Sequence, residues 1–258
     1  MKILIPIDAS ECSKNAAFWA TGKPALFGKD PEIHIFYAQE PASDRIRFAT
    51  DPDTLDEFYR EEAKTVFDSI IDRCGTLPAS VTLDYGVGSP VQTIVSAGDK
   101  LSADMVVMGT HGKGPLDSLL FGSVSNGVLA KSKCPVLMLR DKAAPQSDAL
   151  KVGIAVDGSK YGRAAVRYAL KHISLFGTGA QFYLINVVSD YAGAVMPDMA
   201  GMALPALSEE EVLELQKDEF NEAVEPLRPL FAKAAVATKE ICLVGNAGDE
   251  IAAFAKKK

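Results

Sequence analysis

The pattern best suited to chemistry in this chain is a set of three glycines and one serine at fixed spacing: Gly109, Gly112, Gly122 and Ser123. They lie between an apolar run and a helix-like run. Glycine lets backbone amides approach a phosphate closely, and a helix N-terminus adds oriented N–H donors and partial positive charge. Ser123 stands where a helix needs a cap and a phosphate needs a donor. The pattern predicts a nucleotide phosphate site, without a counterpart in the second half of the chain.

Other signatures of nucleotide binding and catalysis are weaker. No Gly-x-x-x-x-Gly-Lys-Ser/Thr sequence is present, which excludes a P-loop, and Gly86 and Gly88 lack the third glycine of a dinucleotide fingerprint. His111 could act as a general base and Lys113 could contact a γ-phosphate, but such loop residues usually lie in solvent. The loop also lacks an arginine. We therefore assign no catalytic residue, and we expect any phosphoryl transfer to be slow.

The chain contains two copies of one unit. Residues 3–20 align without gaps with residues 152–169, and residues 87–94 align with residues 244–251. Such self-similarity defines the extent of one domain. We expect a first domain at residues 1–141, a linker at 142–149 and a second domain at 150–258.

Strand and helix signals alternate along the first copy. Alternating elements with near-continuous apolar strands predict an α/β fold with a parallel sheet covered by helices on both faces. In such sheets ligands bind beyond the carboxyl ends of the strands, where Asp8, Ala38 and Gly109 all lie. The predicted strands are 2–8, 32–38, 80–85, 105–108 and 135–140. The predicted helices run from 11 to Pro24, from 55 to 71 before Gly75, onward from Pro90, and from 123 to 132.

Composition limits the class of protein. The 258 residues are 48% hydrophobic and 24% charged, as in globular proteins, and the net charge of −7 argues against nucleic-acid binding. Apolar runs reach about half the length of a membrane span, and Pro6 interrupts the first one too early for a signal peptide. Scattered cysteines indicate neither a zinc site nor disulfides. We expect a cytoplasmic protein with reduced thiols and neither a membrane nor a nucleic-acid partner.

Together these motifs resemble the universal stress protein family. The spacing Gly-x-x-Gly, nine residues, Gly-Ser is the ATP-binding signature of that family, and the four loop residues complete it. An opening strand that ends in Pro6, Asp8 and Ser10 is also typical, as is the Cys-Pro-Val-Leu sequence that enters the last strand. The resemblance covers the whole first copy and the available part of the second.

The resemblance implies both the fold and the ligand. It implies two tandem Rossmann-like units of the adenine nucleotide alpha hydrolase type, with strand order 3-2-1-4-5 in the first. It places adenine near Ala38, ribose near Asp8 and Gly109, and the ATP phosphates along the loop and the next helix start. Mg²⁺ could accompany ATP through phosphate oxygens and water. The implied ATP-binding residues are Pro6, Asp8, Ala38, Met108, Gly109, Gly112, Gly122, Ser123, Val124 and Ser125.

Two aspartates occupy equivalent places in the copies. Asp8 and Asp157 each precede a predicted helix, and each could simply cap that helix by accepting hydrogen bonds from its first N–H groups. A ribose contact is a second role that we expect of Asp8 alone.

The second copy departs from the family because it lacks the segment that would hold phosphates. Lys258 aligns with Leu101, so strand four, the glycine loop, the last helix and strand five have no counterpart. Three explanations stay open: the natural protein continues further, a neighbouring chain supplies the strands, or the half-domain folds in a smaller arrangement. Residues 256–258 end within a helical pattern without a stop signal, which favours the first. The family pairs units through strand five, which implies an intrachain pseudo-dimer or a homodimer.

A methionine-rich segment lies within the second copy. Met196, Met199 and Met202 are three residues apart, and thioether sulfurs can bind Cu(I). Because no Cys or His lies nearby, an adaptable apolar flap or interface is favoured. Ser208 and Glu211 then form a capping box that predicts the start of the next helix.

These features predict an ATP-binding stress-response or signalling protein. Nucleotide would bias its conformation or its choice of protein partner, because a ligand shifts an equilibrium only through differential affinity. Two alternatives from other classes stay open. One is an enzyme that acts on the α-phosphate of an adenine nucleotide, and the other is a scaffold that binds no nucleotide.

Overall fold

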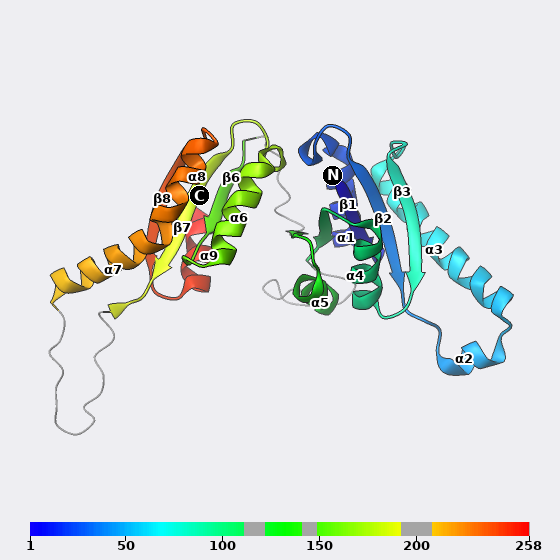
Figure 1. Ribbon diagram of the computed structural model, residues 1–258. Helices are drawn as coiled ribbons and strands as arrows, with labels where there is room; N and C mark the ends of the chain where they lie inside the picture. Colours follow the sequence, from blue (N-terminus) through cyan, green and yellow to red (C-terminus); the bar gives the residue numbers. More distant parts are fainter. Residues whose placement is uncertain (111–121, 141–148, 192–207, 258) are drawn as a thin grey trace, which may run out of the picture. The chain divides into compact units, whose positions relative to one another are not determined.

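The computed structural model describes residues 1–110, 122–140, 149–191 and 208–257. The chain divides into two compact units, Met1–Gln146 and Ser147–Lys258, and each has its own parallel sheet (Figure 1). The predicted linker falls almost entirely outside the described residues. Within the described part of the chain, no helix is both long and apolar enough to cross a membrane.

The first unit has a sheet of five parallel strands in the order β3-β2-β1-β4-β5. This order confirms the one that the family resemblance implied. Ile3 pairs with Ile33 on one side and with Met105 on the other, so β1 lies between β2 and β4. The strands are β1 (Lys2–Ile7), β2 (Glu32–Gln39), β3 (Val81–Val87), β4 (Met105–Gly109) and β5 (Val136–Leu139).

Helices cover both faces of this sheet, as the alternating pattern predicts (Figure 1). One packed pair is α1 with α3, and the other is α4 with α5. Gly75 has a φ of 75° and ends α3, while Pro90 opens α4, which confirms both sequence signals. The helical elements are α1 (Glu11–Gly22), η1 (Pro24–Phe27), α2 (Asp44–Ala49), α3 (Pro52–Cys74), α4 (Pro90–Leu101) and α5 (Ser123–Lys131).

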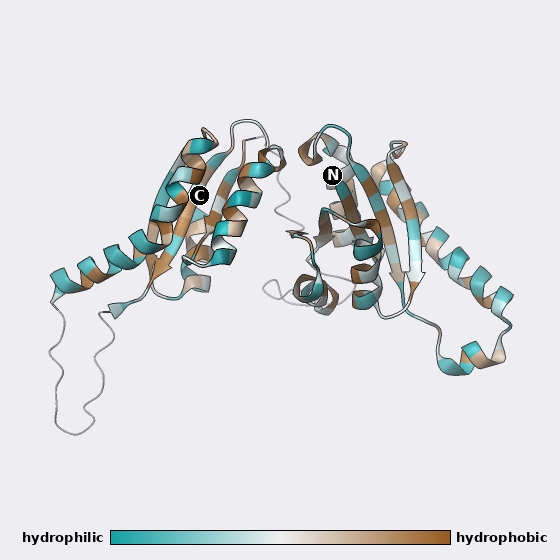
Figure 2. Cartoon of the chain, in the orientation of Figure 1, coloured by the Kyte–Doolittle hydropathy of each residue, from teal (hydrophilic) through white to brown (hydrophobic). Residues whose placement is uncertain are grey.

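The central strands are buried on both faces, which explains their near-continuous apolar sequences. Leu4 and Val106 pack with Ile94 of α4 and Val128 of α5 in one cluster. Successive side chains of a strand point to opposite faces, so Ile3 is buried on the other side. Figure 2 shows hydrophobic residues along these strands and hydrophilic residues on the outer turns of α3.

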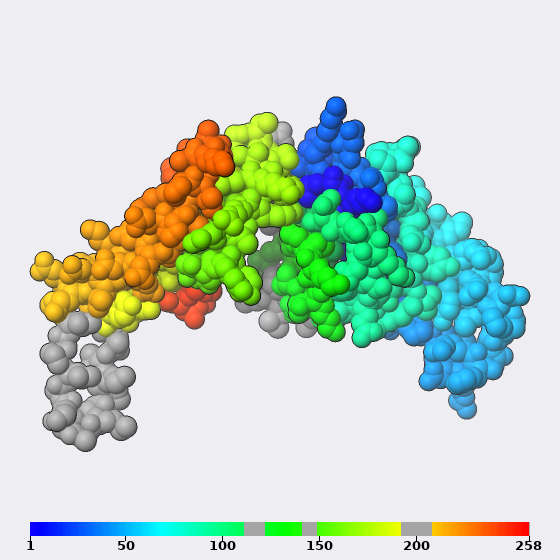
Figure 3. Space-filling view, viewed as in Figure 1, coloured from blue at the N-terminus to red at the C-terminus, as the bar shows by residue number. Residues whose placement is uncertain are grey.

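Helix α2 is an element that the sequence pattern did not predict. It projects with the first turns of α3 beyond the rest of the first unit (Figure 3). Its Phe48 is 89% exposed, and Ile46 is exposed as well. Six residues without a buried side chain leave no apolar periodicity from which a helix could be predicted.

The second unit has a smaller parallel sheet of three strands in the order β6-β7-β8. Leu184 and Val224 belong to its buried core. The capping box of Ser208 and Glu211 is present at the start of α7, as predicted. The elements are β6 (Lys151–Ala155), α6 (Lys160–Lys171), η2 (Ile173–Phe176), β7 (Gln181–Val188), α7 (Glu209–Val224), η4 (Glu225–Leu227), α8 (Arg228–Lys233), β8 (Thr238–Val244) and α9 (Ala247–Lys257). The methionine-rich segment lies outside the described residues.

Candidate functional site

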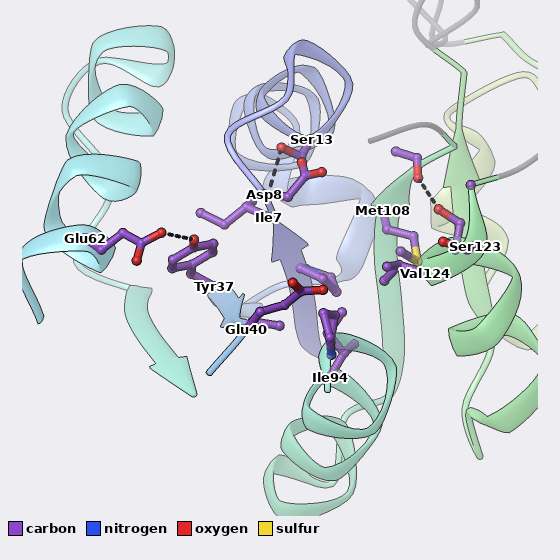
Figure 4. A pocket seen from close by; sticks show the side chains of 16 residues that line it. Ile7, Asp8, Ser13, Tyr37, Glu40, Glu62, Ile94, Met108, Ser123 and Val124 are labelled. Atoms are coloured by element: carbon purple, nitrogen blue, oxygen red, sulfur yellow. Dashed lines mark hydrogen bonds between the residues drawn. The ribbon is translucent and has the colours of Figure 1, made fainter. Parts of the chain in front are cut away.

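A pocket of about 520 Å³ opens in the first unit where β1, β2 and β4 end (Figure 4). Its volume lies within the range of about 300–1,000 Å³ that small-molecule sites occupy. Besides the strand ends, α1, α3, α4 and the start of α5 contribute side chains. The described residues that line it are Pro6, Ile7, Asp8, Ser13, Tyr37, Ala38, Glu40, Glu62, Pro90, Ile94, Met108, Gly109, Gly122, Ser123, Val124 and Ser125.

Nine of the ten residues predicted to bind ATP line this pocket. The tenth, Gly112, lies outside the described residues, as do His111 and Lys113. The fold thus brings together residues that are up to 119 positions apart, from Pro6 to Ser125. Their contact with a ligand stays a prediction.

The start of α5 presents backbone amides without a capping side chain. The N-cap residue is Gly122, with φ −59° and ψ 155°, and no side chain caps this end within the described residues. The first bond of the helix joins the Asn126 amide to the Gly122 carbonyl at 2.9 Å. The amides of residues 123–125 precede it and have no partner within a helix. Ser123 is therefore the first helical residue, and the expectation that it caps α5 was wrong.

Four other helices are closed by a side chain at the same place, whereas α2, α4 and α8 also begin without one. Ser10 caps α1, Asp51 caps α3, Ser159 caps α6 and Ser208 caps α7. Because glycine cannot make such a bond, the first amides of α5 keep their donor capacity for another acceptor.

Ser125 has a structural role that the sequence did not indicate. Its buried hydroxyl donates to the Gly109 carbonyl at 3.1 Å and so joins α5 to the end of β4. A hydroxyl has one proton, so this side chain can only accept from a ligand. Any phosphate contact of Ser125 would use its backbone amide.

Gly109 is needed for packing as well as for any ligand contact. A Cβ atom at this position would lie 2.8 Å from the carbonyl carbon and oxygen of Cys12 and 2.9 Å from its Sγ. Helix α1 therefore approaches β4 more closely than any other residue type would allow. A requirement for glycine here follows from the fold alone.

Asp8 does not cap α1, which corrects the expectation from the sequence. Its Oδ1 accepts from the Ser10 amide at 3.1 Å and the Ser10 hydroxyl at 2.6 Å, and Ser10 is the N-cap. In the second unit Asp157 likewise accepts from the Ser159 amide at 3.0 Å. Each aspartate orients the capping serine, and the carboxylate of Asp8 also reaches the pocket wall.

The wall formed by β2 and α3 carries polar residues that the sequence motifs did not single out. The Tyr37 hydroxyl donates to Glu62 at 3.1 Å, and the Gln39 side-chain amide donates to the other oxygen of the same carboxylate. Burial, with the nearby Glu62 carboxylate, raises the pKa of Tyr37 to about 12. Glu40 could have been predicted from the sequence, because it directly follows the end of β2 and ligands bind beyond strand ends. Nothing in the helical pattern of α3 indicates a role for Glu62.

The described residues form no metal-binding site from protein side chains alone. Nowhere among them do three or more His, Cys, Asp or Glu side chains gather so that they could hold a metal ion. A Mg²⁺ ion carried by ATP fits this donor set only through phosphate oxygens and water, and the carboxylates on the pocket wall are those of Asp8, Glu40 and Glu62.

Comparison with known proteins identifies the family. The universal stress protein family matches residues 1–140 and 150–258. The chain belongs to this family. A universal stress protein of Thermus aquaticus is 32% identical over 147 residues, which are 54% of this chain and 97% of the relative. One from Methanocaldococcus jannaschii is 29% identical over 141 residues, which are 54% of this chain and 81% of the relative.

A solved structure supports the fold over both units of this universal stress protein. The crystal structure of a universal stress protein from Archaeoglobus fulgidus aligns with a TM-score of 0.66 and 21% identity. The alignment covers 99% of this chain and 83% of the other. The shared architecture is the α/β fold with parallel sheets that the sequence predicts.

Proposed function

We propose that the first unit binds an adenine nucleotide, ATP, and that binding sets the conformation or the partner choice of a stress-response protein. The observation that carries this proposal is the uncapped start of α5, which opens into the pocket at the strand ends. Backbone amides and partial positive charge at such a helix start favour a phosphate chain.

The pocket also suits the uncharged part of a nucleotide. Ile7, Ile94, Met108 and Val124 supply apolar wall between the helix start and the β2 side (Figure 4). The transfer of a flat aromatic base from water to such an apolar wall costs little free energy. Asp8 lies between the two ends, where its carboxylate can accept from a ribose hydroxyl. We expect the protein to sense the nucleotide, with slow hydrolysis or none.

Calorimetric titration with ATP tests this proposal in the wild type and in Gly122→Val. The φ of −59° at Gly122 is accessible to valine, so we expect the variant to fold while its side chain fills the phosphate end. Each charge-assisted hydrogen bond that is lost weakens binding by about tenfold or more.

Gly22→Val is the matched control. A Cβ atom at Gly22 meets no atom within 4 Å, and the residue lies at the end of α1 away from the pocket wall. We expect this control to bind ATP like the wild type. Unchanged ATP affinity in folded Gly122→Val would contradict the proposed site.

A further inference from the structure

The first-unit pocket has two chemically different ends. Ser123 and Val124 lie at one end, where α5 starts, and Tyr37 and Glu62 lie at the other (Figure 4). Glu40 adds a second carboxylate to the β2 side. Phosphates are attracted to the helix start and repelled by carboxylates. In the proposed complex the base therefore lies against the Tyr37–Glu62 end.

Glu62 is held in one orientation through both of its oxygens. Oε1 accepts from the Tyr37 hydroxyl at 3.1 Å, and Oε2 accepts from Nε2 of Gln39. Both donors are buried, with Tyr37 6% and Gln39 1% exposed. A glutamate on a helix surface ordinarily samples many rotamers, so these two bonds preorganise a carboxylate on the pocket wall.

This arrangement leaves side chains that accept hydrogen bonds at the base end. Tyr37 donates its one proton to Glu62 and retains only lone pairs. Gln39 is fixed by its partner, because only its NH₂ group can donate to a carboxylate. Gln39 itself does not line the pocket, so the side chains that a ligand can reach at this end are Tyr37, Glu40 and Glu62. A ligand group that bonds to these side chains must therefore supply donors.

We infer that Glu62 is a specificity-determining residue that accepts a hydrogen bond from the exocyclic 6-amino group of the bound base. This inference rests on the proposed nucleotide site and names the feature by which that site selects adenine. Tyr37 and Gln39 are positioning residues, since they act through the carboxylate that they hold. A base without the amino group leaves the carboxylate without that donor.

A chemical double-mutant cycle tests the inference. The two probes are ATP and purine riboside 5′-triphosphate, which differ only in the 6-amino group. A hydrogen bond to a charged group contributes enough that we expect wild-type protein to prefer ATP by about 10–100-fold in calorimetry. In Glu62→Ala the preference should fall to nearly one, because the acceptor is gone.

Glu61→Ala is the matched control, because Glu61 is an exposed neighbour on α3 that does not line the pocket. It should keep the full preference for ATP. In Tyr37→Phe the carboxylate remains but loses one of its two anchors, so we expect an intermediate preference. This variant also tests the inference if Glu62→Ala does not fold.

The outcomes separate this inference from the proposed function. Equal binding of both probes to the wild type would overturn the role of Glu62 while leaving the nucleotide site intact. A preference that persists unchanged in Glu62→Ala would do the same. Failure of the wild type to bind either probe would overturn the proposed function, and this inference with it.

Discussion

Replacing Gly109 with alanine should destabilise the first unit although the change adds one methyl group. The new Cβ atom would stand 2.8 Å from two backbone atoms of Cys12 and 2.9 Å from its Sγ. Contacts of that length are not tolerated, and two of the three atoms belong to the backbone of α1. The helix must therefore move away from β4, which also strains the bond from Ser125 to the Gly109 carbonyl.

The magnitude follows from the cost of overpacking a close-packed core. Such insertions typically cost about 1–3 kcal/mol. For a domain of this size, each kcal/mol lowers the melting temperature by about 2–4 °C. We expect the thermal transition of the first unit, followed by circular dichroism or calorimetry, to fall by about 2–12 °C.

Gly98→Ala is the matched control for this prediction. Gly98 is buried within α4, but a Cβ atom there would lie 3.6 Å from Leu4 Cδ2, an ordinary contact. Because alanine favours a helix by about 1 kcal/mol over glycine, this variant should be as stable as the wild type or more stable. A Gly109→Ala variant with wild-type stability, or equal losses in both variants, would refute the packing account.

Two further predictions concern the pH dependence of stability and the hydrophobic core of the second unit. The pKa of Tyr37 is raised from 10.0 to about 12 in the folded state, so its contribution is complete below pH 10 and is lost as the pH rises towards 12. We expect about 2–3 kcal/mol of stability to disappear over that window in denaturant unfolding, and Tyr37→Phe to lose correspondingly less; identical profiles would contradict this. Leu184 is fully buried in the second unit, so Leu184→Ala should lower the unfolding free energy by about 2–5 kcal/mol, and a loss well under 1 kcal/mol would mean that this core is loosely packed.

Much of the fold of the first unit could be predicted because its strands are buried on both faces. Apolar runs such as 105–108 stand out against the polar turns that separate them, and Pro90 and Gly75 mark helix ends by their backbone restrictions. Helix α2 could not be predicted in this way, because it buries no side chain and so leaves no periodic pattern.

The candidate site was predictable only where backbone geometry constrains the sequence. Gly109 is required because the close approach of α1 to β4 leaves no room for a side chain, and Gly122 leaves the first amides of α5 without a capping side chain. Tyr37 and Glu62 were missed, since they meet through packing of α3 on β2 across 25 positions and obey no spacing rule. Capping was also misjudged: an aspartate and a serine two residues apart can both accept from nearby amides, and only the structure shows that Ser10 caps while Asp8 orients it.

The central claim is that the amides of residues 123–125 hold the phosphates of ATP. A crystal structure of the full chain grown with ATP tests it most directly. We expect electron density for the phosphates over the start of α5, with the base between the apolar wall and Glu62. Density for solvent alone at that helix start, at ATP concentrations that saturate any binding seen in calorimetry, would contradict the account.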